Sequence, residues 1–265
     1  MKTGVIAGSG KLPIILVEEM VKSGNQVLVI SVARNYDDSL RNLASDFHQL
    51  SVGQINKIIN TLLDYGVEEL AIIGNVSKGE LFNPLRFDTK ALKILGTMKN
   101  KGDSSIFSAV ADEIESSGIQ LIDQRKYLGK ILPEKKILTK RKPSKDQLRD
   151  IEYGMELARR VSELDIGQTV VVKNQVILAV EAIEGTDEAI HRGAKLCKGG
   201  AVVAKASKSD QDFRFDVPTI GSDTIDVLIE TKASALAIEF GRSFLIDRDL
   251  TLSKADSAKI VVAVI

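Results

Sequence analysis

The chain has 265 residues, of which 44% are hydrophobic and 27% charged, with 20 glycines and only 5 prolines. This composition is typical of a folded globular protein and excludes a disordered or collagen-like chain, and the length favours two domains over one. Lysine and arginine number 36, as do aspartate and glutamate, so the chain lacks the basic excess typical of nucleic-acid-binding proteins.

A single cysteine, Cys197, excludes an intramolecular disulfide, and with only two histidines the chain has no ligand set for structural zinc. The N-terminal apolar stretch is interrupted by Gly10, Lys11 and Glu18 before it reaches the length of a signal peptide or a membrane span. We therefore expect a cytoplasmic protein.

The first part of the chain alternates short β-branched runs with amphipathic stretches of helical length. Strands are expected near residues 3–8, 26–32, 69–76 and 119–123, and helices near 12–24, 53–66 and 104–118. Strands that are apolar on both faces and separated by helices form a parallel sheet. Residues 1–130 are therefore predicted to form a Rossmann-like α/β domain.

Residues 131–146 contain two prolines and a cluster of basic residues with weak periodicity, which is typical of a linker. The remaining residues, 147–265, are predicted to form a second α/β domain. It begins with a helix near 146–165, continues with two strands around a turn at Lys173 and Asn174, and then alternates helices and short strands. The halves show no convincing sequence repeat.

The motif GSGKLP, residues 8–13, follows a predicted strand and opens a predicted helix, a setting in which backbone N–H groups hold phosphate. It matches neither the dinucleotide fingerprint, which needs glycine where Pro13 stands, nor the P-loop, which needs Ser or Thr where Leu12 stands. Gly8, Gly10 and Leu12 are candidate substrate contacts. A tight turn with no ligand is the alternative.

Two further glycine motifs lie where a ligand of a parallel sheet would bind. Gly74, Asn75 and Val76 follow the fourth predicted strand, and the carboxyl ends of parallel strands are the usual ligand edge. Gly102 and Asp103 open a helix, where Asp103 is equally explained as an N-cap.

The motif EGTD opens the helix after the predicted strand pair of the second domain. It contributes Glu184, Gly185, Thr186 and Asp187 as candidate substrate contacts. Capping of this helix by Thr186 and interaction of Asp187 with its dipole are the alternative.

The run DFRFDVP, residues 212–218, alternates charged and apolar residues. As a strand it would place Asp212, Arg214 and Asp216 on one face and the two phenylalanines on the other. Carboxylates that bind Mg²⁺ beside a phosphate-binding arginine, with Lys205 upstream, would form a diphosphate site. The alternative is an arginine that neutralises two surface carboxylates.

These motifs, taken in order, resemble the LpxI family of UDP-2,3-diacylglucosamine pyrophosphatases over nearly the whole chain. The resemblance rests on IAGSGKLP, GNVSK, KGDSSIFSAVADEIESSG, LDIGQTVVV, VEAIEGTDEAIHR and FDVPTIGSDTI. It implies Mg²⁺-dependent hydrolysis of UDP-2,3-diacylglucosamine to UMP and 2,3-diacylglucosamine 1-phosphate in lipid A biosynthesis, with water attacking the phosphorus on the sugar side.

The resemblance also implies two domains that hold the substrate between them, and a homodimer. The essential aspartate of the family falls on Asp216, in a motif where Val217 replaces leucine. Asp216 is therefore the candidate catalytic residue, as metal ligand or general base. Asp187 is the candidate second metal ligand, with Asp103 as the alternative. Thr219 of the same motif is a further candidate substrate contact. Apart from the resemblance, the lysine-rich linker is explained by solvation, and weak, transient contact with the inner-membrane surface is the alternative.

Two alternative functions are also compatible with the sequence. One is a dinucleotide-dependent oxidoreductase, which is weakened by Pro13 and by the lack of an acid directly after the second predicted strand. The other is a noncatalytic nucleotide-sugar-binding protein, from which the enzyme differs only through the presence of Asp216.

Overall fold

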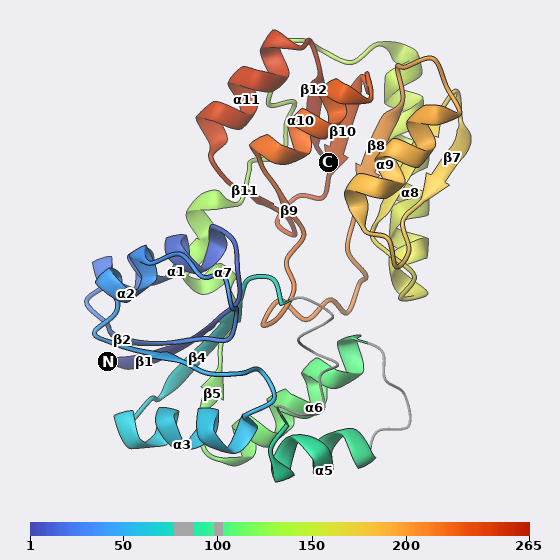
Figure 1. Cartoon of the computed structure of the whole chain (residues 1–265). Helices are drawn as coiled ribbons and strands as arrows, with labels where there is room; N and C mark the ends of the chain where they lie inside the picture. The colour runs from blue at the N-terminus through green and yellow to red at the C-terminus, as the bar shows by residue number, and fades with distance from the viewer. Residues whose placement is uncertain (77–86, 98–102) are drawn as a thin grey trace. The chain divides into compact units, whose positions relative to one another are not determined.

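The computed structural model describes residues 1–76, 87–97 and 103–265 (Figure 1). The chain divides into two compact units. Unit 1 comprises residues 1–128 together with 212–216, and unit 2 comprises residues 129–211 and 217–265. The end of the first stretch lies close to the predicted boundary at residue 130, but the return of residues 212–216 to unit 1 is not expected from the sequence.

Unit 1 is built on a parallel sheet of five strands in the order β3-β2-β1-β4-β5. This is the order of a doubly wound α/β sheet, and it confirms the predicted Rossmann-like fold class. The strands are β1 (Lys2–Ala7), β2 (Gln26–Ser31), β3 (Asp46–Gln49), β4 (Glu69–Ile73) and β5 (Gln120–Leu121).

Helices cover both faces of the unit 1 sheet (Figure 1). One face carries α1 (Leu12–Lys22), α2 (Ser39–Leu43) and α7 (Arg125–Leu128), and the other carries α3 (Ile55–Tyr65), α5 (Thr89–Thr97) and α6 (Asp103–Ser116). The spacing of Ile55, Ile58, Ile59 and Leu62 places all four side chains on the buried face of α3. This helix ends at Gly66, whose left-handed φ of 82° suits a residue without Cβ.

Unit 2 is built on a mixed sheet in the order β12-β10-β8-β6-β7. Strands β8 (Val202–Lys205), β10 (Ala235–Ile238) and β12 (Val261–Val264) are parallel, whereas β6 (Thr169–Lys173) runs antiparallel to β8 and forms a hairpin with β7 (Val176–Val180). A separate parallel pair joins β9 (Thr219–Ile220) to β11 (Phe244–Leu245).

The unit 2 sheet also lies between helical layers (Figure 1). Helix α8 (Lys145–Glu163) packs Ile151, Met155 and Ala158 on one face of the sheet. The other face packs against α9 (Thr186–Lys195), α10 (Ser222–Glu230) and α11 (Arg248–Ser257). A short 3₁₀ turn, η2 (Gly129–Ile131), begins the unit. Unit 2 is therefore an α/β domain, as the sequence predicts.

The predicted linker, residues 131–146, differs from the structure because part of it belongs to unit 2. Ile137 bridges to Ala263, the Leu138 N–H donates to the Val262 carbonyl at 2.9 Å, and the Val264 N–H donates to Lys136 at 3.0 Å. The physical reason is that β12 is an edge strand, whose unpaired backbone groups accept this segment as a partial further strand.

The predicted strand over DFRFDVP is wrong, because residues 213–215 form a turn. The Asp212 carboxylate accepts the Arg214 N–H at 3.0 Å, while its carbonyl accepts the N–H groups of Phe215 and Asp216 at 3.2 and 3.3 Å. Aspartate favours such local hydrogen bonds, which compete with an extended conformation. The charged residues therefore do not share one face of a strand.

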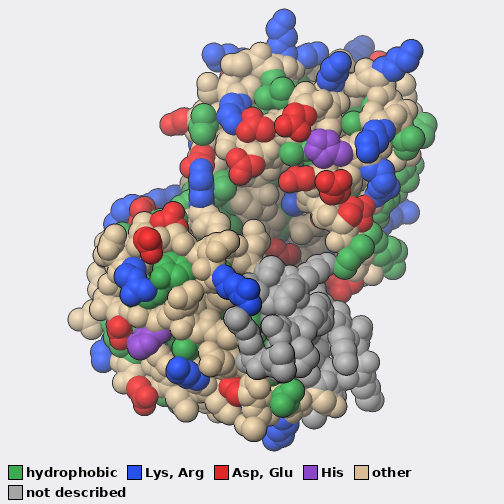
Figure 2. Space-filling model, viewed as in Figure 1, with side chains coloured by type: hydrophobic (Ala, Val, Ile, Leu, Met, Phe, Trp, Pro, Cys, Tyr) green, Lys and Arg blue, Asp and Glu red, His purple; other side chains and the backbone are tan. Residues whose placement is uncertain are grey.

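The hydrophobic pattern did not predict α2, α5, α7, α11 or β3. These elements are short or weakly amphipathic; in α11, for example, only Thr251 and Ala255 are buried. No helix in the described ranges is both long and apolar enough to cross a membrane. On the face shown in Figure 2, acidic and basic side chains are intermingled, in keeping with the zero net charge.

Candidate active site

The strand order of unit 1 reverses direction between β1 and β4, and open α/β sheets bind ligands outside the carboxyl ends of strands at such a point. Gly8 follows β1 and Gly74 follows β4, and the Gly8 N–H donates to the Ile73 carbonyl at 2.8 Å. One residue further on, Ser9 and Asn75 exchange two backbone hydrogen bonds of 2.8 and 3.0 Å. The structure therefore brings the predicted residues of GSGKLP and GNV together.

The three glycines at this edge differ in why glycine is needed. A Cβ on Gly8 would lie 2.5 Å from the Asn75 carbonyl oxygen, and one on Gly74 would lie 2.7 Å from Pro13. Packing of the two chain segments therefore explains both residues. Gly10 has a φ of 101°, and within residues 1–76, 87–97 and 103–265 nothing lies within 4 Å of its Cβ position, so its backbone is the one that a ligand can approach.

The other predicted residues of these motifs line the same edge. Leu12 is half-buried at the first position of α1, a helix with no side-chain N-cap hydrogen bond. Asn75 is exposed, and Val76 is half-buried against the unit 1 core. Gly102 lies outside the described residues, as does the side chain of Asp103, although Asp103 begins α6 as predicted.

Residues 212–216, here called the return segment, attach to unit 1 through their aromatic side chains. Phe213 is buried, and the Arg125 guanidinium lies 3.8 Å from its ring centroid. The ring of Phe215 stacks on that of Phe107 at 5.8 Å and packs against the unit 1 core. Burial of these rings explains why a segment flanked on both sides by unit 2 belongs to unit 1.

Gln124, which the sequence did not single out, fixes the position of the return segment. It is buried, and its side-chain amide donates to the Ile72 carbonyl of β4 at 2.8 Å and to the Phe215 carbonyl at 3.0 Å. Its backbone N–H donates to the Phe213 carbonyl at 3.1 Å. Asp216, directly after Phe215, is thereby held beside the end of β4 with its side chain exposed. An isolated glutamine carries no sequence signal for this role.

Two predicted substrate contacts of the return segment are engaged in ion pairs. Arg214 donates from Nε and Nη2 to the Asp212 carboxylate at 2.8 to 3.1 Å and from Nη1 to Glu115 at 2.9 Å. These hydrogen bonds, chiefly those to Asp212, raise the pKa of Arg214 above its usual value. The geometry favours the alternative in which Arg214 neutralises neighbouring carboxylates and secures the turn.

Unit 2 gathers a second set of predicted residues at the carboxyl end of β8. Lys205 is buried and donates to the Thr186 hydroxyl at 3.1 Å, and Thr186 donates to the Glu181 carboxylate at 3.0 Å. Glu181, also buried, was missed by the sequence analysis. Gly167 of the LDIGQ motif packs directly against the Glu181 backbone, since a Cβ on Gly167 would lie 2.3 Å from the Glu181 carbonyl oxygen. This glycine is the sequence feature that is related to Glu181.

The remaining predicted residues of unit 2 are more exposed. Glu184 forms an ion pair with Arg192. The pKa of Glu184 is lowered chiefly by a hydrogen bond from its own backbone, and next by the hydrogen bond from Arg192. Gly185 has a φ of 86° with open space around its Cβ position, and Asp187 is exposed in the first turn of α9. Thr219 donates to the Val217 carbonyl at 2.9 Å.

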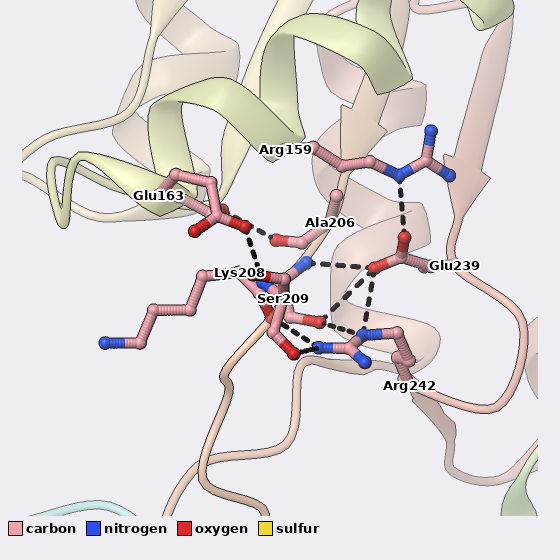
Figure 3. A network of polar contacts seen from close by, with 9 residues as sticks. Arg159, Glu163, Ala206, Lys208, Ser209, Glu239 and Arg242 are labelled. Carbon is pink, nitrogen blue, oxygen red and sulfur yellow. Dashed lines mark hydrogen bonds and ion pairs between the residues drawn. The ribbon is translucent and has the colours of Figure 1, made fainter.

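A polar network anchors residues 207–209, which lead from β8 toward the return segment (Figure 3). Glu239 accepts from the Ser207 N–H at 3.2 Å and from Arg159 at 2.7 Å. Arg242 donates to the Ser207 hydroxyl at 2.8 Å and to the carbonyl groups of Lys208 and Ser209. These hydrogen bonds fix the position of residues 207–209 on unit 2.

The side chains that could donate to the predicted Mg²⁺ are dispersed. Across residues 1–76, 87–97 and 103–265, no three or more Asp, Glu, His or Cys side chains are grouped so as to hold a metal ion. Mg²⁺ commonly takes one or two protein carboxylates and completes its shell with water and substrate phosphate. The exposed Asp216 fits that kind of binding, in which the substrate supplies further ligands.

The fold and these polar groups define a two-unit α/β protein with a candidate site at the switch point of its parallel sheet. Family models described as LpxI N-terminal domain and LpxI C-terminal domain match residues 2–131 and 134–263. The UDP-2,3-diacylglucosamine pyrophosphatase LpxI of Caulobacter vibrioides is 33% identical over 273 residues, covering 98% of this chain and 96% of that protein. The chain belongs to the LpxI family and is a hydrolase, which confirms the resemblance seen in the sequence.

Two solved structures that resemble this chain are remote. The biotin carboxylase domain of a thermophilic 2-oxoglutarate carboxylase has a TM-score of 0.27 at 12% identity, over 74% of this chain and 32% of that chain. The biotin carboxylase subunit of pyruvate carboxylase has a TM-score of 0.28 at 11% identity, over 68% of this chain and 35% of that chain. Likenesses at this level carry no conclusion about fold or function.

Proposed function

We propose that this protein hydrolyses the diphosphate of UDP-2,3-diacylglucosamine to UMP and 2,3-diacylglucosamine 1-phosphate in lipid A biosynthesis. The relative whose name states this substrate matches along almost the whole chain. The observation that carries the proposal is the placement of Asp216, an exposed carboxylate held at the switch point of the unit 1 sheet through Gln124.

In the proposed reaction, Asp216 orients a water molecule toward the phosphorus on the sugar side of the diphosphate. Its carboxylate either accepts the proton of that water or serves as the metal ligand. Mg²⁺, when bound, would neutralise charge on the diphosphate and lower the pKa of a bound water. UMP then leaves as the phosphorus–oxygen bond to it breaks, and the attacking oxygen remains on the sugar phosphate.

The chain offers further groups for the substrate in each unit. In unit 1 the backbone of Gly10 and the first turn of α1, which has no side-chain cap hydrogen bond, are suited to a phosphate, and Asn75 can both donate and accept hydrogen bonds. In unit 2 the ammonium group of Lys205, with Thr186, is suited to an anion. Asp187 is retained as a proposed second metal ligand on its chemistry alone.

The cellular setting is part of the same proposal. A lipid-linked substrate calls for a cytoplasmic enzyme in transient contact with the inner-membrane surface. The basic residues of segment 131–146 would contribute weak attraction to anionic lipid, at about 1 kcal/mol per basic residue. A homodimer is proposed on the family resemblance.

The test is release of UMP from UDP-2,3-diacylglucosamine in the presence of Mg²⁺. We expect Asp216→Asn to lower kcat by about a hundredfold or more, the scale of a lost general base. Asp210→Asn is the matched control, because Asp210 is also exposed and lies nearby in the chain. Full activity of Asp216→Asn would remove the proposed mechanism, and absence of UMP with the unsubstituted protein would remove the proposed reaction.

The product and metal assignments have separate tests. Hydrolysis in ¹⁸O-labelled water should place the label in 2,3-diacylglucosamine 1-phosphate, and label in UMP would show attack on the other phosphorus. Chelation of Mg²⁺ should abolish turnover, and its return should restore it. Binding of the substrate without turnover under all these conditions would favour the noncatalytic nucleotide-sugar-binding alternative.

A further inference from the structure

Unit 2 buries a connected set of polar side chains at one end of its sheet. Thr169 begins β6, Glu181 directly follows β7 and Lys205 ends β8, and all three are buried. Thr186, at the start of α9, is half-buried. The ladder fixes their spacing, because Thr169 pairs with Lys205 and its carbonyl accepts the Glu181 N–H at 2.9 Å. Buried polar groups are unfavourable unless they are hydrogen-bonded, so their contacts need an explanation.

The hydroxyl of Thr186 joins the two charged members of this set. It donates its single proton to the Glu181 carboxylate at 3.0 Å, and its oxygen accepts from the Lys205 ammonium at 3.1 Å. Because that proton is committed, Thr169 is the donor in the 3.4 Å contact between the two threonine hydroxyls. The other Glu181 oxygen accepts the Gln168 N–H at 3.4 Å. Glu181 therefore determines the direction in which the Thr186 hydroxyl points.

Lys205 has more hydrogen-bonding capacity than this set uses. An ammonium group carries three protons, and among residues 1–76, 87–97 and 103–265 no ion pair accompanies its hydrogen bond to Thr186. A buried cation without a paired anion is costly, which favours an anionic ligand. Gly185, before α9, has a φ of 86°, and no atom of the described residues lies within 4 Å of its Cβ position. A ligand can therefore approach the backbone beside Lys205.

We propose that Glu181 is a positioning residue for the substrate diphosphate. It orients the Thr186 hydroxyl, and that hydroxyl holds the Lys205 ammonium where it meets the phosphate oxygens. The inference rests on the proposed function, in which Lys205 binds the diphosphate. Without the Glu181 carboxylate the Thr186 proton is free to turn toward other acceptors, and Lys205 loses a fixed acceptor.

The test removes the charge of Glu181 with little change in shape. In Glu181→Gln the side chain can donate to the Thr186 hydroxyl as well as accept from it, so the direction of the hydroxyl is no longer fixed. We expect kcat for release of UMP from UDP-2,3-diacylglucosamine to fall by about tenfold while KM changes little, because Lys205 acts most strongly where charge builds on the phosphate. Glu188→Gln, at an exposed position of α9, is the control and should keep both values. Thermal unfolding of each variant establishes that it is folded.

A double-mutant cycle with Lys205→Met distinguishes positioning from support of the fold. If Glu181 acts through Lys205, Glu181→Gln should lower kcat in the native background and change it by less than about twofold in the Lys205→Met background. A purely structural role would lower kcat by the same factor in both. Thr186→Val breaks the same link with a side chain of the same shape, and it supplies the cycle if Glu181→Gln does not fold.

Equal factors in the two backgrounds, or full activity of a folded Glu181→Gln protein, would overturn the inference. Failure of the proposed function would look different, because the unsubstituted protein would then release no UMP. Titration with inorganic pyrophosphate decides in that event. Affinity that falls in Lys205→Met and in Glu181→Gln, but no further in the double variant, supports the positioning role. Equal affinities, additive losses or no binding to the unsubstituted protein reject it.

Discussion

Gly8 shows how one residue at the switch point can be required without touching a ligand. Its missing Cβ leaves room for the Asn75 backbone, and the resulting contact joins the ends of β1 and β4. Gly10, only two positions later, is required instead for its left-handed φ.

Replacement of Gly8 by alanine should therefore destabilise unit 1 and disturb the candidate site together. A Cβ at 2.5 Å from the Asn75 oxygen cannot be accommodated without moving one backbone segment, and we expect a loss of about 1–3 kcal/mol in the free energy of unfolding. Denaturant titration checks this. Gly96→Ala in α5 is the control, because no atom of the described residues lies within 4 Å of its Cβ position, and it should be neutral or stabilising by up to about 1 kcal/mol.

Gln124 allows a prediction about positioning as distinct from stability. Gln124→Leu leaves the carbonyl groups of Ile72 and Phe215 without their donor, and each such loss costs about 1–3 kcal/mol. The return segment is then no longer joined to β4 through this side chain. We therefore also expect kcat to fall by about tenfold or more while KM changes little.

Steady-state kinetics and denaturant titration of the same Gln124→Leu preparation separate the two effects. Gln120→Leu, at an exposed position of β5, is the control and should keep both values. A stable but fully active Gln124→Leu protein would show that Asp216 is positioned without this side chain.

At the scale of elements, the β6–β7 hairpin depends on a helix on the same unit. The turn residues Asn174 and Gln175 both have positive φ, of 52° and 58°, which non-glycine residues rarely adopt. Asp150 of α8, which is buried, accepts their N–H groups at 2.9 and 2.7 Å. The turn lies one residue beyond its predicted position at Lys173 and Asn174, and its support comes from a helix that precedes the hairpin in the chain.

Asp150→Ala should loosen this hairpin. Hydrogen bonds to a charged acceptor contribute about 1.5–3 kcal/mol, so we expect a loss of that order in the free energy of unfolding, with faster amide exchange at residues 174 and 175. Glu152→Ala, at an exposed position of the same helix, should change stability by no more than about 0.5 kcal/mol. Equal stability of the two variants would assign the turn to local preference alone.

At the scale of the whole molecule, the chain enters unit 2 after Leu128, returns to unit 1 for residues 212–216 and enters unit 2 again at Val217. A site residue can therefore be supplied to one unit by a sequence that belongs mostly to the other. Phe213 and Phe215 provide the buried area that makes this return favourable.

Phe213→Ala should accordingly weaken unit 1 although its sequence neighbours belong to unit 2. Truncation of a buried phenylalanine costs about 3–5 kcal/mol, and we expect faster hydrogen exchange in β4, β5 and α7 with little change in β8 and β10. Mass spectrometry of exchanged peptides checks the distribution. Phe240→Ala, at a position 51% exposed, is the control. Exchange that rises mainly in unit 2 would contradict the assignment of the return segment.

The local patterns predicted most of the regular elements because burial on one or both faces leaves a direct imprint on residue spacing. The run 53–66 predicted α3, and the continuous apolar runs predicted the buried strands of both sheets. The same patterns failed for DFRFDVP, where alternation of charge suggested a strand but Asp212 forms a turn. They also failed for residues 131–146. Part of this segment bonds to the edge strand β12, and no local pattern of residues predicts that contact.

The sequence by itself determined the α/β class, the family and the candidate carboxylate Asp216, because these depend on local periodicity and on motifs in a characteristic order. Only the tertiary structure decided which groups surround that carboxylate. The contacts of Gln124 and the ion pair of Arg214 with Glu115 arise between residues far apart in the chain. Such contacts depend on how packed elements meet in space, and a single sequence carries no periodic signal for them.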